Sequence, residues 1–495
     1  MEKVTAKNVA RVAQAYFKPS NRTVGLFMPE AKSDRAEIPP TPEISALVEG
    51  YKGKAQMAEG EVFEPSFTNI ESRTKTGMAG TVKYAFLPKT TRGNTVVANM
   101  TIRFGDVNSL QNKQMVSYLA GRMLKKGTSK HTEQQLNDAL DALKATVSIS
   151  GSQNQVNVSI ETVRENLPQT LALVNEMLKD ATMPEKEFKE IIQQELASCE
   201  QQLSDPQFQA SNAMQRHMNP WSKSDVRYTP TSQEEINELK AAKIEDVRKF
   251  YKDYYGGSDA TVSIVGDFDE NTAKKLITEG VGSWKSPKPF KRLESKYFDV
   301  AVKNDAIKTP DKANALFFAA LNFPMRDDDA DYPALVLGNV VLGGGALSSR
   351  LANRIRQKEG ISYGVGSGLQ ANPFDKAGFF YTYAIYAPEN VERLEAAFKE
   401  EVNKILKEGI TEEELASAKK FVAQNGLLGR SNDRQLSGKL NSYQYLKRDL
   451  KWDATYEDNI SKLTIDDVNK ALRKNIDPAK ISLFKAGDFD KVKKP

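Results

Sequence analysis

Few side chains in this chain could act as nucleophiles or hold a metal ion. Its 495 residues include two histidines, His131 and His217, and a single cysteine, Cys199. A Ser/His/Asp or Cys/His catalytic set needs a histidine beside its nucleophile, and a thiolate zinc site needs several cysteines. His131 directly precedes Thr132 at an expected helix start, where a role in capping accounts for it. The sequence therefore predicts no disulfide, no thiolate zinc site and no self-sufficient hydrolytic centre.

Three consecutive glycines, Gly343–Gly345, form another candidate motif. A P-loop would continue from its glycines into Lys followed by Ser or Thr, but here Ala-Leu-Ser-Ser follows. We therefore expect a turn that enters a helix and approaches a neighbouring segment closely, which glycine permits because it has no Cβ.

Composition excludes several classes of protein. Hydrophobic residues make up 39% of the chain and charged residues 27%, which is typical of a soluble globular protein. No apolar run reaches the roughly 18–20 residues that a membrane span requires, and the first residues have a polar, helical pattern unlike a signal peptide. The net charge of +5 is spread over interspersed acidic and basic residues, so we do not expect nucleic-acid binding.

A repeated segment organises the chain. Residues 244–269 (IEDVRKFYKDYYGGSDATVSIVGDFD) and residues 465–490 (IDDVNKALRKNIDPAKISLFKAGDFD) each indicate an amphipathic helix, a turn and a strand. In both copies a valine stands nineteen residues before the glycine of Gly-Asp-Phe-Asp. A third, more divergent copy opens the chain, where Val9 aligns with Val247. Because each full copy ends a long α/β unit, we expect the opening copy to end a preceding unit.

The repeats and two proline-rich stretches divide the chain into three parts. We expect residues 1–58 to be the end of a preceding homologous domain plus a Pro-rich linker, residues 59–290 to be one domain, and residues 291–495 to be a second. The predicted fold class is α+β, with two homologous mixed α/β sandwich domains. Each would contain an antiparallel-rich sheet covered by helices.

Hydrophobic periodicity places the main elements. Alternating apolar residues predict strands at residues 82–86, 96–104, 145–162, 314–323, 361–369 and 378–386. The turn-rich stretch between the first two strands suggests that they form a hairpin. A helical period predicts helices at residues 108–125, 166–180, 184–203, 331–342, 347–358, 390–407 and 411–428.

The chain resembles the pitrilysin/insulysin family of zinc metallopeptidases over essentially its whole length. The likeness is carried by the Gly-Asp-Phe-Asp repeats, LAGRMLKKGT (119–128), RENLPQTLALVNEML (164–178) and GGGALSSRLANRIRQKEGISYGV (343–365). Members of this family have four homologous α/β domains, in one chain or two, whose halves enclose a chamber in which peptides are cut. The resemblance implies domains of the mitochondrial-processing-peptidase type that form one half of a clam shell.

The zinc motif of this family is absent from the chain. The active half carries His-x-x-Glu-His and a later glutamate; the histidines and that glutamate hold zinc, and the motif glutamate takes a proton from the bound water. Aligned on Lys-Gly-Thr, the motif positions here hold Tyr118, Gly121 and Arg122, and Glu195 matches the later glutamate. Arginine stays protonated and is not a zinc ligand, so we expect no metal in this chain. We predict that Arg122 instead forms an ion pair with Glu195; the alternative is that both side chains point into solvent.

A second family feature is present. Arg356 and Tyr363 have the seven-residue spacing of an Arg/Tyr pair that the non-zinc half contributes to the zinc site of the other half. The resemblance implies that Tyr363 donates a hydrogen bond to the oxyanion at the attacked carbonyl and that Arg356 holds the substrate backbone. The alternative is structural, with Arg356 as a cation at a helix end and Tyr363 in a strand core.

We therefore expect the non-catalytic half of a zinc metallopeptidase. It would be inactive alone, and would close the chamber of a partner that bears His-x-x-Glu-His and zinc, in the same polypeptide or as a separate subunit. The expected substrates are peptides. A catalytically silent scaffold and a peptide-binding module remain as alternatives. Because bacterial relatives of this layout are often exported, we expect a periplasmic location, with the cytoplasm as the alternative.

Overall fold

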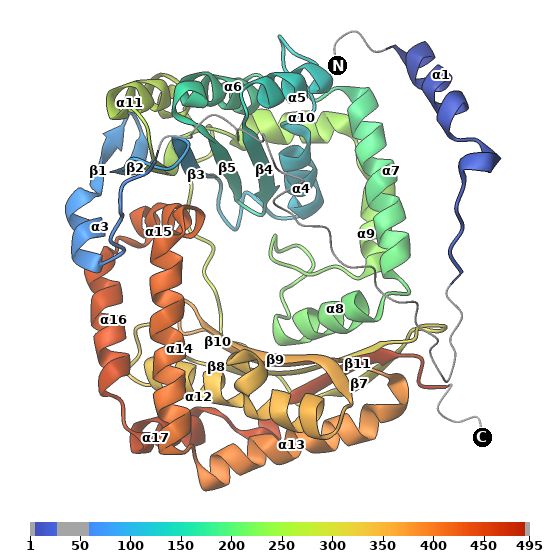
Figure 1. Ribbon diagram of the computed structural model, residues 1–495, viewed down its shortest axis with the longest axis vertical. Coiled ribbons are helices and arrows are strands. Elements are labelled where there is room, and N and C mark those ends of the chain that lie inside the picture. Colours follow the sequence, from blue (N-terminus) through green and yellow to red (C-terminus); the bar gives the residue numbers. More distant parts are fainter. Residues whose placement is uncertain (1–4, 27–58, 491–495) are drawn as a thin grey trace, which may run out of the picture. The chain divides into compact units, whose positions relative to one another are not determined.

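The computed structural model describes residues 5–26 and 59–490 of the chain (Figure 1). These residues belong to two compact units, one within residues 1–56 and one within residues 57–495. The predicted Pro-rich linker after the opening copy lies outside the described residues. In the first unit, helix α1 (Ala6–Tyr16) is followed by a short 3₁₀ helix, η1 (Pro19–Asn21).

The second unit contains two mixed sheets. The first sheet has the strand order β1-β2-β6-β3-β5-β4. Its strands are β1 (Lys75–Ala79), β2 (Val82–Pro88), β3 (Thr95–Arg103), β4 (Thr146–Ser152), β5 (Gln155–Val163) and β6 (Asp259–Gly266). Strand β6 comes from the first full copy of the repeated segment, residues 244–269, which we call a closing segment because it ends its α/β unit. This strand lies inside the sheet, parallel to β2 and antiparallel to β3.

The second sheet repeats this plan in the order β7-β11-β8-β10-β9. Its strands are β7 (Asn304–Lys308), β8 (Ala315–Phe323), β9 (Ser362–Ala371), β10 (Gly378–Tyr386) and β11 (Ser482–Gly487). The closing strand β11 again lies inside, parallel to β7 and antiparallel to β8. Without β1, the first sheet has the same order and the same strand directions as the second. The predicted α+β fold class is therefore confirmed.

The predicted hairpin between the first two strands is wrong. Strand β2 pairs with β1 on one side and with β6 on the other, so β6 separates it from β3. The sequence pattern identified both strands but could not show that a strand far along the chain inserts between them. Turn residues do not require a hairpin when the sheet offers a better partner.

Each sheet is covered by helices whose apolar faces form its core. We call the part of the chain that forms the first sheet the first domain and the part that forms the second sheet the second domain. The helices of the first domain are α3 (Phe67–Arg73), α4 (Gln114–Met123), α5 (Glu133–Ala142), α6 (Leu167–Lys179), α7 (Glu185–Gln202), α8 (Pro206–Met218), α9 (Ser232–Ala241), α10 (Ile244–Tyr254) and α11 (Glu270–Glu279). Those of the second are α12 (Tyr332–Asn339), α13 (Val391–Glu408), α14 (Glu412–Ser431), α15 (Asp433–Leu446), α16 (Leu450–Lys462) and α17 (Ile465–Asn475). Capping boxes at Thr132, Thr231, Thr411 and Thr464 set the starts of α5, α9, α14 and α17.

The two domains exchange one helix each (Figure 1). Helix α8 of the first domain packs on the second sheet, where Met214 and Met218 contact Phe484. Helix α15 of the second domain packs on the first sheet, where its leucines join Leu87 and Val265 in a separate apolar cluster. Each sheet therefore packs against a helix from the other domain, and both sheets belong to one compact unit.

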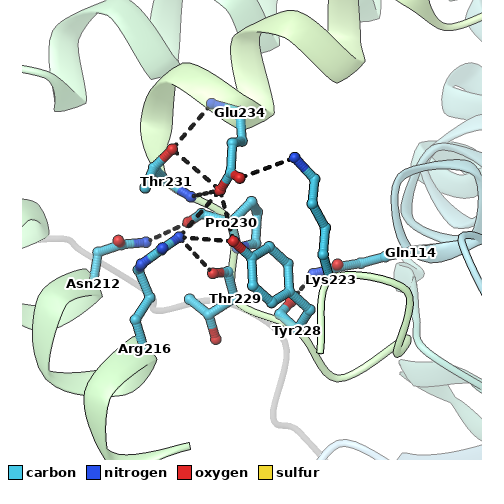
Figure 2. Close-up of polar contacts among 9 residues, drawn as sticks. All are labelled: Gln114, Asn212, Arg216, Lys223, Tyr228, Thr229, Pro230, Thr231 and Glu234. Carbon is cyan, nitrogen blue, oxygen red and sulfur yellow. Dashed lines mark hydrogen bonds and ion pairs between the residues drawn. The ribbon is translucent and has the colours of Figure 1, made fainter. Parts of the chain in front are cut away.

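A charged network holds the segment around α8 to the first domain (Figure 2). The Glu234 carboxylate, at the start of α9, accepts hydrogen bonds from Arg216 of α8 and from Tyr228 at 3.1 and 2.9 Å. Lys223 and the backbone of Thr231 donate to the same carboxylate. These donors hold the pKa of Glu234 well below its ordinary value, the Thr231 amide being the first cause.

The predicted helix at residues 347–358 has an irregular form. Residues Val340–Gly344 and Ala352–Lys358 form the π-helical turns η4 and η6, and Ala346–Ser348 forms the 3₁₀ helix η5 between them. The three glycines lie in this region, where a Cβ on Gly343 would lie 2.5 Å from the Ser367 hydroxyl, in agreement with a close approach instead of a phosphate loop. In the described part of the chain, no helix is long and apolar enough to span a membrane.

Candidate functional site

Arg356 and Tyr363 lie together on the surface of the second domain. Arg356 is in the last turn of η6, and its guanidinium carbon lies 5.2 Å from the centre of the Tyr363 ring. Tyr363 is 85% exposed, although it belongs to strand β9. The strand-core alternative for Tyr363 is therefore wrong, whereas a cation at the end of a helical segment does describe the position of Arg356. A cation–π contact at this distance holds the guanidinium and the ring side by side.

A β-bulge explains why Tyr363 points outward. In the pairing of β9 with β10, Ile385 is opposite Gly364 but Tyr386 is opposite Ser362, so Tyr363 is the extra residue. The Ser362 hydroxyl stabilises this irregularity by donating to the Ile385 carbonyl at 2.7 Å. Bulges at sheet edges re-aim side chains, and β9 is an edge strand of its sheet.

Glycines and aromatic residues extend this surface beyond the bulge. Gly366 and Gly368 of β9 lie opposite Tyr383 and Tyr381 of β10, and a Cβ on either glycine would press against the facing ring. Tyr383 and Ile385 remain partly exposed on this face. The sheet edge therefore presents an aromatic surface next to Tyr363.

The residues predicted at the zinc-motif positions meet in the first domain. Tyr118 and Arg122 are one turn apart on α4, and Glu195 is on α7. The predicted ion pair is present, with Arg122 Nη2 2.9 Å from Glu195 Oε1. Burial, and then the neighbouring Glu195 carboxylate, raise the pKa of Tyr118 to about 12. Tyr118, Arg122 and Glu195, the three residues predicted at the zinc-ligand positions, therefore lie together.

Gly121, the residue predicted at the position of the motif glutamate, lies against β4 with no room for a side chain. A Cβ on Gly121 would lie 2.4 Å from the Gly151 nitrogen, because α4 packs directly against β4 there. Gly151 is equally restricted, since its own Cβ would lie 2.8 Å from the Gly121 Cα. This contact was not predicted, because two isolated glycines give no sequence signal of meeting.

Zinc does not fit these residues. One ligand position holds a permanent cation that already satisfies Glu195, and a second holds a phenol that burial keeps protonated. Within residues 5–26 and 59–490, no group of three or more His, Cys, Asp or Glu side chains is arranged to hold a metal ion.

The remaining candidate side chains have structural partners. His131 Nδ1 lies 2.7 Å from Glu176 Oε1, whereas Thr132 provides the helix cap, so the predicted capping role belongs to Thr132. His217 Nε2 lies 2.8 Å from the Ala301 carbonyl oxygen. Cys199 is buried, and burial raises the pKa of its thiol to about 11, which makes it unreactive at neutral pH.

Comparisons with known proteins agree with this geometry. A model described as "Peptidase M16 inactive domain" matches residues 241–422, and one described as "Insulinase (Peptidase family M16)" matches residues 84–228. The non-peptidase homolog YmxG of Helicobacter pylori is 21% identical over 383 residues, covering 76% of this chain and 85% of YmxG. An uncharacterized zinc protease of Streptomyces coelicolor is 24% identical over 368 residues, covering 71% of this chain and 76% of that protein.

Solved structures share the fold. A crystal structure of a peptidase M16 inactive domain from Pseudomonas fluorescens has a TM-score of 0.71 at 20% identity, covering 84% of this chain and 98% of that chain. The periplasmic protease PqqL of Escherichia coli has a TM-score of 0.63 at 16% identity, and the match covers 98% of this chain but 50% of PqqL. The chain therefore belongs to peptidase family M16, the insulinase family, and carries its inactive domain.

Proposed function

We propose that this chain is the non-catalytic half of a zinc metallopeptidase and supplies Arg356 and Tyr363 to the catalytic site of a partner half. The observation that supports the proposal most directly is the exposure of Tyr363, which a bulge turns out of its sheet beside the Arg356 guanidinium. A tyrosine placed only for packing would bury its ring. Here the chain forms an irregular strand that presents the ring and hydroxyl to solvent.

The chemistry of the two groups suits peptide hydrolysis. The Tyr363 hydroxyl would donate a hydrogen bond to the oxyanion that forms at the attacked carbonyl, and removal of such a donor typically costs about 10²–10³ in rate. Arg356 would hold the substrate backbone by donating to peptide carbonyls, because a guanidinium is a fixed multiple donor. Because no group of side chains suited to a metal ion is present in residues 5–26 and 59–490, zinc and the general base would belong to the partner with His-x-x-Glu-His.

The aromatic edge of the second sheet favours peptides as the substrates. Exposed Tyr383 and Ile385 could contact side chains, and β9, as an edge strand of its sheet, offers backbone groups on one side for pairing with a peptide. The same surface supports the alternative of a peptide-binding module without chemistry. The non-peptidase name of the H. pylori relative favours a silent scaffold. The periplasmic location of PqqL supports an equivalent location for this chain.

The test is peptide hydrolysis by the chain alone and mixed with the zinc-motif half from the same genome. We expect no hydrolysis by either half alone and hydrolysis by the mixture. Tyr363→Phe and Arg356→Ala should each lower kcat/KM by about 10²-fold or more. Lys358→Ala, in the same turn of η6, is the matched control and should change it less than about threefold. Full activity of both site variants would refute the proposal, and peptide binding without turnover would establish the binding module instead.

A further inference from the structure

The N-terminal segment repeats the closing helix and turn of both domains in structural detail. Helix α1 has eleven residues, as do α10 and α17, and the matching valines Val9, Val247 and Val468 are all fourth in their helices. Thr5 forms a capping box at the start of α1, as Thr464 does for α17. The 3₁₀ helices Pro19–Asn21 and Pro478–Lys480 follow α1 and α17 at the same distance.

Burial differs completely between the copies. Val9 is 59% exposed, whereas Val247 and Val468 are 0% exposed. Phe17 is 87% exposed, whereas its equivalents Tyr255 and Ile476 are 2% and 6% exposed. The same difference holds for Val24, whose equivalents Val262 and Leu483 are buried. The segment therefore has the apolar face of a closing element, but no residue of α1 is buried.

The two domains show what covers such a face. After α10, strand β6 enters between a parallel neighbour, β2, and an antiparallel neighbour, β3. After α17, strand β11 enters between β7 and β8 with the same directions. An inner strand forms hydrogen bonds on both sides, so a sheet that lacks its closing strand is divided in two. Residues 22–26 belong to no strand in the described structure.

Neither sheet of this chain can accept the segment, because β6 and β11 already fill the two inner positions. We propose that residues 5–26 dock into a third homologous sheet, on the zinc-motif half of the peptidase. There, residues 23–26 would be the inner strand and α1 would cover the adjacent helix layer. This inference rests on the proposed function. It adds that the non-catalytic half completes the fold of its partner by strand addition.

The proposed partner has a defined chemistry. It is an M16-type α/β domain without its own closing helix and strand, and it offers one parallel and one antiparallel strand edge. The apolar residues Val9, Val12 and Tyr16 would enter its core, because Val247, Phe250 and Tyr254 do so at the equivalent positions of α10. A second copy of this chain is a poor partner, since its two inner positions are also filled.

The experiment co-expresses the tagged full chain with the zinc-motif half from the same genome as a separate polypeptide. One form of that half ends before its second closing helix, and the other includes that helix and strand. Hydrogen exchange is measured on the amides of residues 5–26 in each purified sample. We expect protection with the shortened form and none with the complete form. Equal exchange in both would overturn the proposal, and a stable homodimer with protected residues 5–26 would assign the segment to a second copy.

Paired variants provide a second measurement. Val9→Asp should weaken association at least about 100-fold, because it would bury a charge in the partner's core. Gln14→Asp adds the same charge at a position whose equivalents, Lys252 and Arg473, are exposed, and should change association less than about threefold. Equal binding of wild type and Val9→Asp would also overturn the docking. A failure of the docking proposal can be distinguished from a failure of the proposed function, because the proposed function is tested separately by peptide hydrolysis with the Arg356 and Tyr363 variants.

Discussion

Replacing Tyr118 and Arg122 by histidine should create a zinc site in the first domain. The two positions are one helical turn apart on α4, and both side chains now interact with Glu195. Two histidines at this spacing and a carboxylate supply three ligands and leave one tetrahedral position for water. We therefore expect the double variant to bind one zinc ion per chain, whereas the wild type binds none at these residues.

The free energy can be worked out from the present contacts. The Arg122 side chain is 45% exposed, so its ion pair with Glu195 contributes about 1 kcal/mol or less, and the double variant without metal should lose about that amount. Zinc at a free concentration 100 times its Kd adds about 2.7 kcal/mol to the free energy of unfolding. The zinc-loaded variant should therefore have a higher Tm than the wild type under the same conditions.

Metal analysis and thermal unfolding with and without zinc provide the assay. Adding Glu195→Gln to the double variant is the control, and it should abolish stoichiometric binding by removing the carboxylate ligand. If the double variant gains no zinc, or if Glu195→Gln leaves its affinity unchanged, the assignment of these positions to a vacated zinc site is refuted.

The new site should bind zinc without hydrolysing peptides. The resemblance implies that the motif glutamate is the general base, and we predict that Gly121 stands at its position. No side chain fits at Gly121 unless β4 moves, because a Cβ there would lie 2.4 Å from the Gly151 nitrogen. Peptide hydrolysis by the double variant would show that another group in this domain acts as the base.

Two further predictions concern stability. Gly121→Ala should lower the free energy of unfolding by about 1–3 kcal/mol, because its Cβ would overlap Gly151. Gly438→Ala on α15 is the control and should raise the free energy of unfolding by up to about 1 kcal/mol, because nothing lies within 4 Å of the added Cβ. Urea unfolding compares the two variants, and equal effects would contradict the close contact between Gly121 and Gly151. Glu234→Gln should cost about 1.5–3 kcal/mol at neutral pH, because the carboxylate accepts charged hydrogen bonds. Since the folded-state pKa of Glu234 is lowered, its stabilisation is present above the ordinary pKa of 4.5 and is lost as pH falls toward the folded-state value. Urea unfolding from pH 7 to pH 3 should therefore show the wild type and Glu234→Gln converging at the acidic end, and a difference that stays constant would refute this account.

Much of the fold could be predicted because its signals are local. Alternating apolar residues located β8, β9 and β10, and helical periodicity located α6, α7, α13 and α14 within a few residues. The repeated closing segment also identified two units of the same plan, which the two sheets confirm. Helices α8, α9, α15 and α16 were not predicted. For α8 and α15, the reason is that their apolar residues match the sheet of the other domain, a relation that sequence spacing does not record.

Some features of the candidate site could likewise be predicted from the sequence, whereas others depend on the tertiary structure. The sequence by itself predicted which residues stand at the zinc-motif positions, because residue types and their spacing can be read without the fold, and Arg122 is a type that does not bind zinc. It also determined the spacing of Arg356 and Tyr363. The tertiary structure alone decided that Tyr363 is exposed, since this depends on a one-residue shift between β9 and β10. It alone brought Gly121 against Gly151, because contacts between distant segments arise only when helices and sheets pack.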